Sequence, residues 1–253
     1  MMSNSALVSY TKISPNRNSP RNHPIDRISI HCVVGQCSVE TLGNIFAPTS
    51  REASCNYGIG ADGRVGMYVE EKDRSWCTSS GANDHRAVTI ECASDTTHPY
   101  AVNDKVYATL IKLCVDICKR NGKSKLLWFG NKDKTLAYTP KADEMVLTVH
   151  RWFANKSCPG DYLYNLHGQI AAEVTAQLSP KKPEPQTPAK TGRYNKIADM
   201  PGYAQPTIIK MADKGIISGS GGAKDENGRP ADLDLSIDMI RVFVTNDRAG
   251  LYD

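Results

Sequence analysis

Two short segments alternate between apolar and polar residues, which predicts half-buried β-strands. Residues 27–34 place Ile30 on an apolar face and His31 on the opposite face. Residues 87–93 repeat the pattern and place Glu91 on the more polar face. A carboxylate in an otherwise apolar strand is costly to bury, so Glu91 needs either a partner or a chemical task.

Longer segments predict a hairpin and two helices around these strands. Residues 56–71 contain two strand-like runs joined by the Ala-Asp-Gly turn at 61–63. Apolar residues recur at helical spacing in 103–122 and in 162–178, with Asn103 as the expected N-cap of the first helix. Because strands and helices interleave, we expect an α/β fold with a mixed central β-sheet flanked by helices.

A segment rich in proline and lysine, residues 179–193, predicts an extended linker, because it has no large apolar residue to bury. It separates a large N-terminal domain, 1–178, which we expect to be catalytic, from a small C-terminal domain, 194–253. Apolar residues around Ile208, and a second run that follows the expected cap Ser236, predict that the small domain is mainly helical. Sixty residues form a marginal core, so a homodimer would help this domain.

Composition excludes several classes of protein. The 253-residue chain has no apolar run near the ~18 residues that span a bilayer, so we expect no membrane insertion. Its net charge of +4 comes without a basic–aromatic stripe, so we expect no nucleic-acid partner. The first 24 residues lack the apolar core of a signal peptide, which favours synthesis in the cytoplasm. Eight cysteines without a CxxC pair favour buried free thiols over a disulfide scaffold.

The segment TVHRWFANKSCPGD, residues 148–161, concentrates candidate chemistry, because it holds His150, Lys156 and Cys158. Imidazole and thiolate are natural zinc ligands, and a catalytic zinc keeps three protein ligands and one open position. We expect His31 to be the third ligand, since most other histidines lie in loop-like polar sequence. A histidine and a cysteine eight residues apart also occur by chance, so their spacing alone leaves structural roles open.

Several separated motifs together resemble one known family. The motifs are His31 in ISIHC, Tyr57 in NYGIGADGRV, Glu91 in VTIECA, and His150, Lys156 and Cys158 in HRWFANKSCPGD. Their order resembles that of the type-2 N-acetylmuramoyl-L-alanine amidases, which include amidase-type phage lysozymes and the peptidoglycan recognition proteins. The resemblance covers roughly residues 10–178.

The resemblance implies a Zn²⁺ ion held by His31, His150 and Cys158. It also implies hydrolysis of the amide between N-acetylmuramic acid and L-alanine in bacterial peptidoglycan, the expected partner. Zinc suits this reaction because it lowers the pKa of its bound water and polarises the carbonyl group.

Three further residues take catalytic roles from the resemblance. Lys156 is implied to stabilise the oxyanion, and Tyr57 to orient the water or to hydrogen-bond the carbonyl. Glu91 is implied to carry the proton from the water to the leaving amine. Each has a structural alternative: Tyr57 as a cross-strand aromatic, Lys156 as a solvated loop lysine, and Glu91 as the partner of Arg86.

The small domain has a weaker resemblance to a degenerate S-layer-homology module and to the C-terminal domains of amidase endolysins from Firmicute phages. This implies binding to the cell wall, with a secondary wall polymer as a partner of this domain and dimerisation as the rival role. The whole chain is therefore expected to be a phage or prophage endolysin that a holin releases to the wall. A non-catalytic peptidoglycan-binding protein and a zinc peptidase that cuts a stem-peptide bond are the alternatives.

Overall fold

The computed structural model describes residues 3–178 and 193–253 of the chain. The chain divides into two compact units, residues 1–180 and 181–253. The linker expected at 179–193 lies outside the described residues except for Arg193.

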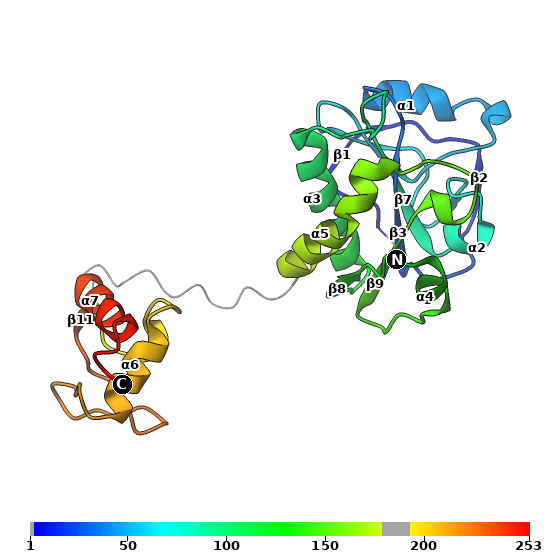
Figure 1. Ribbon diagram of the computed structural model, residues 1–253. Helices are drawn as coiled ribbons and strands as arrows, with labels where there is room; N and C mark the ends of the chain where they lie inside the picture. Colours follow the sequence, from blue (N-terminus) through cyan, green and yellow to red (C-terminus); the bar gives the residue numbers. More distant parts are fainter. Residues whose placement is uncertain (1–2, 179–192) are drawn as a thin grey trace. The chain divides into compact units, whose positions relative to one another are not determined.

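A seven-stranded sheet forms the centre of the larger unit (Figure 1). In order across the sheet the strands are β1 (Val8–Thr11), β5 (Val65–Met67), β4 (Tyr57–Ile59), β7 (Ala87–Cys92), β3 (Arg27–Cys32), β9 (Glu144–Thr148) and β8 (Lys125–Leu127). Neighbouring strands are parallel except for β4 and β5, which form the antiparallel hairpin expected from the sequence. The mixed sheet is therefore confirmed.

Helices flank this sheet, as expected. They are α1 (Val39–Phe46), α2 (Gly81–Asp84), α3 (Asp104–Arg120), α4 (Lys132–Ala137) and α5 (Gly160–Leu178). The predicted cap of α3 is confirmed, because the Asn103 side chain accepts a hydrogen bond from the backbone N–H of Val106. Figure 1 shows α3 and α5 together on one side of the sheet. Every helix in the described part of the chain is too short or too polar to span a bilayer.

The two faces of the sheet have different roles. Ile30 of β3 and Ile90 of β7 are fully buried in a core that also contains Leu110 of α3 and Leu163 of α5. Each such side chain contributes roughly 1.5–3 kcal/mol when it is fully buried. Because neighbouring residues of a strand point to opposite faces, His31 lies on the face away from this core.

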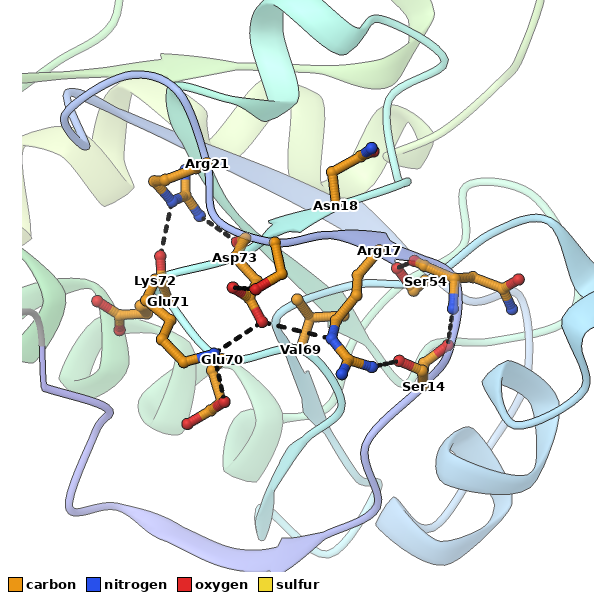
Figure 2. Close-up of polar contacts among 12 residues, drawn as sticks. Ser14, Arg17, Asn18, Arg21, Ser54, Val69, Glu70, Glu71, Lys72 and Asp73 are labelled. Carbon is orange, nitrogen blue, oxygen red and sulfur yellow. Dashed lines mark hydrogen bonds and ion pairs between the residues drawn. The ribbon is translucent and has the colours of Figure 1, made fainter.

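The buried side chain of Arg21 holds the 70–73 turn in place through hydrogen bonds to backbone carbonyls. Its guanidinium donates to the backbone carbonyls of Glu71 (2.6 Å) and Asp73 (2.9 Å), and also to that of His85 (2.8 Å). Figure 2 shows this arginine beside the 70–73 turn, where Asp73 also pairs with Lys72 at 3.0 Å. The turn is therefore held in place just before the short strand β6 (Arg74–Ser75), which pairs with β2 (Arg17–Asn18).

The smaller unit is mainly helical, as predicted. It contains α6 (Gln205–Asp213), α7 (Ile237–Arg248) and an antiparallel pair of two-residue strands, β10 (Arg193–Tyr194) and β11 (Leu235–Ser236). Ser236 caps α7 by accepting a hydrogen bond from the N–H of Met239 at 3.2 Å. Ile208 and Ile240 are fully buried in a core that belongs to this unit alone.

Candidate metal centre and catalytic groups

The imidazole of His31 is held in one tautomer by Ser29, two residues earlier on β3. The Ser29 hydroxyl lies 3.2 Å from the Thr148 carbonyl, which can only accept, so the hydroxyl donates there. Its oxygen is then the acceptor for the Nε2–H of His31, at 3.2 Å. This leaves Nδ1 of His31 unprotonated, which is the form that binds a metal.

Cys158 lies directly opposite this nitrogen. Its Sγ is 3.2 Å from Nδ1 of His31, although 127 residues separate the two in the chain. The loop that carries Cys158 is closed by a hydrogen bond from the Arg151 N–H to the Cys158 carbonyl, at 3.1 Å. It then turns sharply at Gly160, whose φ of 78° favours glycine and where a Cβ would come within 2.9 Å of the Pro99 carbonyl oxygen.

His150 completes the group at the end of β9, where it begins a short 3-10 helix, His150–Trp152. Its ring centroid lies 5.2 Å from that of His31, and its Nε2 contacts the Ser79 hydroxyl at 3.1 Å. One ligand atom each from His31, His150 and Cys158 all lie within 4.8 Å of one another. The three residues named as ligands in the sequence therefore meet at one point.

Burial keeps both imidazoles neutral. Desolvation and the neighbouring His150 lower the pKa of His31 well below its ordinary value. Desolvation, followed by the positive charge of Lys156, lowers the pKa of His150. Neutral imidazoles are the form in which histidine coordinates metals.

Glu91 faces the same group from the neighbouring strand. His31 and Glu91 are register partners on parallel strands, and Oε1 of Glu91 lies 3.9 Å from Nδ1 of His31. The Glu91 side chain is 15% exposed, and its Oε2 has no hydrogen-bond partner among the described residues. Desolvation raises the pKa of this carboxyl to about 8. The expected alternative, an Arg86 pair, is not formed, because Arg86 pairs with Asp26 at 2.9 Å.

Cys77 is a neighbour of Glu91 that the sequence analysis did not identify. Its Sγ donates to Oε1 of Glu91 at 3.9 Å, and its backbone N–H donates to the buried carboxylate of Asp84 at 3.0 Å. Cys32 also lines a cavity with Cys77 and Glu91. Neither thiol has a ligand-like spacing in the sequence, so only the fold places them here.

Lys156 lines a cavity of about 540 Å³ that opens beside His150. Arg51 and Arg74 add two further cations to its wall, and Trp76 contributes an aromatic ring. Lys156 itself is exposed. The wall also carries the carboxylates of Glu52 and Asp84, so three cations face two anions. The cavity next to the three candidate ligands is therefore net positive, which suits a substrate with carboxylate groups.

Tyr57 does not lie with these residues, and its expected catalytic role requires correction. In the sheet Tyr57 pairs with Ile90, so it shares the core face and not the face of Glu91. Its hydroxyl donates to Glu71 at 2.7 Å and accepts from the Ser5 N–H at 2.9 Å. Desolvation raises the pKa of this phenol above its ordinary value. Tyr57 is therefore a buried structural residue.

Comparison with known protein families agrees with this geometry. The family model described as N-acetylmuramoyl-L-alanine amidase matches residues 21–161, which is more than half of the chain. The chain therefore belongs to this amidase family. No curated protein matches the chain significantly.

Solved structures similar to this chain include one described as an amidase, one described as an endolysin and one described as a peptidoglycan recognition protein. The N-acetylmuramoyl-L-alanine amidase LysC from Clostridium intestinale is 17% identical, with 69% of this chain and 96% of that chain covered and a TM-score of 0.45. The Ph2119 endolysin of a Thermus scotoductus bacteriophage is 15% identical, with coverages of 61% and 89% and a TM-score of 0.41. The Drosophila peptidoglycan recognition protein SA is 17% identical, with coverages of 61% and 88% and a TM-score of 0.45.

The cluster fits the zinc ion that the family implies. Two imidazole nitrogens and one thiolate are a donor set that zinc prefers, and three protein ligands leave a fourth position open. The Ser29 contact to Nε2 of His31 supplies the outer hydrogen bond that fixes a ligand ring. His31, His150 and Cys158 would hold the ion.

Proposed function

We propose that the larger unit is a zinc-dependent hydrolase of the amide between N-acetylmuramic acid and L-alanine in peptidoglycan. The observation that carries the proposal is the meeting of His31, His150 and Cys158 within 4.8 Å on the polar face of the sheet. Family membership supplies the reaction class, and the three donors supply a place for the metal.

A bound zinc ion would polarise the scissile carbonyl and lower the pKa of water at the site. Glu91 would take the proton from the attacking water and deliver it to the leaving amine of L-alanine. Its position 3.9 Å from His31 supports this role, because the carboxylate borders the three ligands. Burial disfavours the ionised form of this carboxyl, and a cation held by the three ligands would favour it. In the ionised form, the free Oε2 can accept the proton without breaking an existing hydrogen bond.

Lys156 would stabilise the negative charge that develops on the amide oxygen in the transition state. Lys156 lines the same cavity as His150. Its positive charge contributes to the lowered pKa of that imidazole, so its charge acts on the ligand group. Its exposure leaves the ammonium group accessible to a substrate in this cavity.

The cavity beside the ligands suits the stem peptide of the substrate. Stem peptides carry carboxylate groups, and Arg51 and Arg74 place cationic groups on the cavity wall. The Nε–H of Arg74 is buried and has no hydrogen-bond partner among the described residues, so this side chain keeps an unused donor beside the cavity.

Mass spectrometry of digested peptidoglycan tests the proposal. New L-alanine N-termini should form, disappear with a chelator and return with added zinc. Cleavage within the stem peptide would instead make the chain a zinc peptidase. Intact amides, together with sedimentation of the protein on the walls, would make it a non-catalytic binding protein.

For the smaller unit we propose binding to the bacterial cell wall, with a secondary wall polymer as its ligand. The independent core around Ile208 and Ile240 supports a separate binding module. Combined with the amidase unit, this module supports the role of a phage or prophage endolysin that a holin releases and that lyses the cell. Sedimentation of the isolated unit with purified walls, before and after removal of wall polymers, tests the binding.

A further inference from the structure

A second group of candidate ligand atoms overlaps the first. One atom each from His31, Cys77 and Glu91 also lie within 4.8 Å of one another. Imidazole, thiolate and carboxylate are all zinc ligands, so the second set is chemically as suitable as the first. Sulfur and nitrogen donors favour zinc or a softer ion over magnesium or calcium.

Both sets depend on His31, and this makes them exclusive. Only Nδ1 of His31 is free to bind, because the Ser29 hydroxyl occupies Nε2. A single imidazole nitrogen donates one lone pair to one ion. An ion held with His150 and Cys158 therefore leaves no imidazole for the other set.

The second set is built on well-fixed backbone. His31 and Glu91 are register partners on adjacent parallel strands. Cys77 is fixed by Asp84, whose carboxylate accepts hydrogen bonds from the backbone N–H groups of Cys77 and Thr78 and from the Thr78 hydroxyl, the last at 2.6 Å. The Cys77 thiol already contacts Oε1 of Glu91, while Oε2 is unpartnered within the described residues.

We propose that the metal ion has a second position, held by His31, Cys77 and Glu91, which it occupies when Cys158 is not available as a ligand. In this position the ion would be coordinated by the carboxylate of Glu91. Because Glu91 then cannot accept a proton, the second position retains the metal in an inactive form. The proposal rests on the metal site of the proposed function, but not on the amide bond that it cleaves.

Cobalt substitution tests the proposal without an activity measurement. Co²⁺ is the probe, and its sulfur-to-cobalt charge-transfer band in the near ultraviolet reports a thiolate ligand. Cys158→Ala should still bind one equivalent of Co²⁺ with a band of similar amplitude to that of the wild type. The double variant Cys77→Ser/Cys158→Ala should lose the band. Cys37→Ser/Cys158→Ala is the matched control and should keep it, because Cys37 belongs to neither set.

Two outcomes would overturn the proposal. Absence of the band in Cys158→Ala, with normal circular dichroism, would mean that the second set does not bind. Persistence of the band in the double variant would mean that another thiol supplies the sulfur, with Cys32, a neighbour of Cys158, as a candidate. If Cys158→Ala does not fold, Cys158→Ser gives the same reading, because its oxygen produces no sulfur band. Wild-type protein that binds no Co²⁺ would overturn the metal site itself, whereas a bound metal without amidase activity would leave this inference standing.

Discussion

Nδ1 of His31 lies 3.9 Å from Oε1 of Glu91, and the two residues are register partners on the adjacent parallel strands β3 and β7. Backbone pairing therefore fixes the distance between a candidate zinc ligand and the candidate proton carrier. A rigid sheet positions such groups more accurately than mobile loops do, and accurate positioning is what general acid–base chemistry requires.

Glu91→Gln should lower kcat by about 10²–10⁴-fold, because the amide cannot carry the proton. Zinc content should stay near that of the wild type, since His31, His150 and Cys158 are unchanged. Steady-state kinetics on a soluble muropeptide and metal analysis of the same preparation measure both effects. Glu40→Gln is the control, because Glu40 pairs with Arg64 at the surface. Wild-type kcat in the Glu91 variant would remove Glu91 from the mechanism.

Lys156→Ala should lower kcat by about 10²-fold, because a fixed charge next to the developing oxyanion is lost. The zinc content should not change, and Lys156→Arg should restore part of the rate. Lys119→Ala removes an exposed lysine from α3 and serves as the matched control. Equal kcat values for the two alanine variants would identify Lys156 as a solvated surface residue.

Tyr57→Phe should leave kcat unchanged and should reduce stability by about 1–3 kcal/mol. The change removes the hydroxyl that donates to Glu71 and accepts from the Ser5 N–H, and leaves both buried groups with one partner fewer. Urea denaturation measures the free energy of unfolding. A large fall in kcat at unchanged stability would restore Tyr57 to the active site.

Stability should fall as the pH is lowered from about 6.5 to about 4, in part because of His167. Desolvation lowers the pKa of this buried imidazole from 6.5 to about 4 in the folded chain. Between these values the unfolded chain binds more protons than the folded chain, so acid favours unfolding. The loss of folding stability that comes from His167 reaches its full value of about 3 kcal/mol below pH 4.

Urea denaturation across this pH range, for wild type and His167→Phe, isolates the contribution of His167. The phenylalanine variant should show a flatter pH dependence, because the contribution of His167 is lost. Some pH dependence should persist, because the other titrating groups remain. Parallel pH curves for the two proteins would contradict the assignment.

A chain that ends at Leu178 should fold and should cleave soluble muropeptides as fast as the full chain. The core formed by α3, α5 and the sheet lies wholly in residues before this point. If the smaller unit binds walls, the shortened chain should be slower on intact walls at low protein concentration. Equal rates on intact walls would contradict a targeting role for the smaller unit.

The sequence by itself determined the features that depend on neighbouring residues. Alternation placed His31 and Glu91 opposite the apolar residues of their strands, and the structure has both on that face. Asn103 and Ser236 were identifiable as caps because a cap needs only a side chain three residues before its partner N–H. The donor types in HRWFANKSCPGD indicated a metal site before any distance was known.

Other features depended on how distant segments meet. The hairpin strand that contains Tyr57 can present that ring to either face, and only its pairing with Ile90 of β7 selects the core face. β9 was not predicted, because a strand buried on both faces does not alternate.

Cys77 and Ser29 became relevant only through tertiary contacts, with Glu91 and with Thr148 respectively. Local sequence carries the preferences of each segment, whereas strand order and register decide which side chains share a site. The sequence therefore indicated the chemistry of this protein. Which residues lie together in the site was decided by the packing of segments that are far apart in the chain.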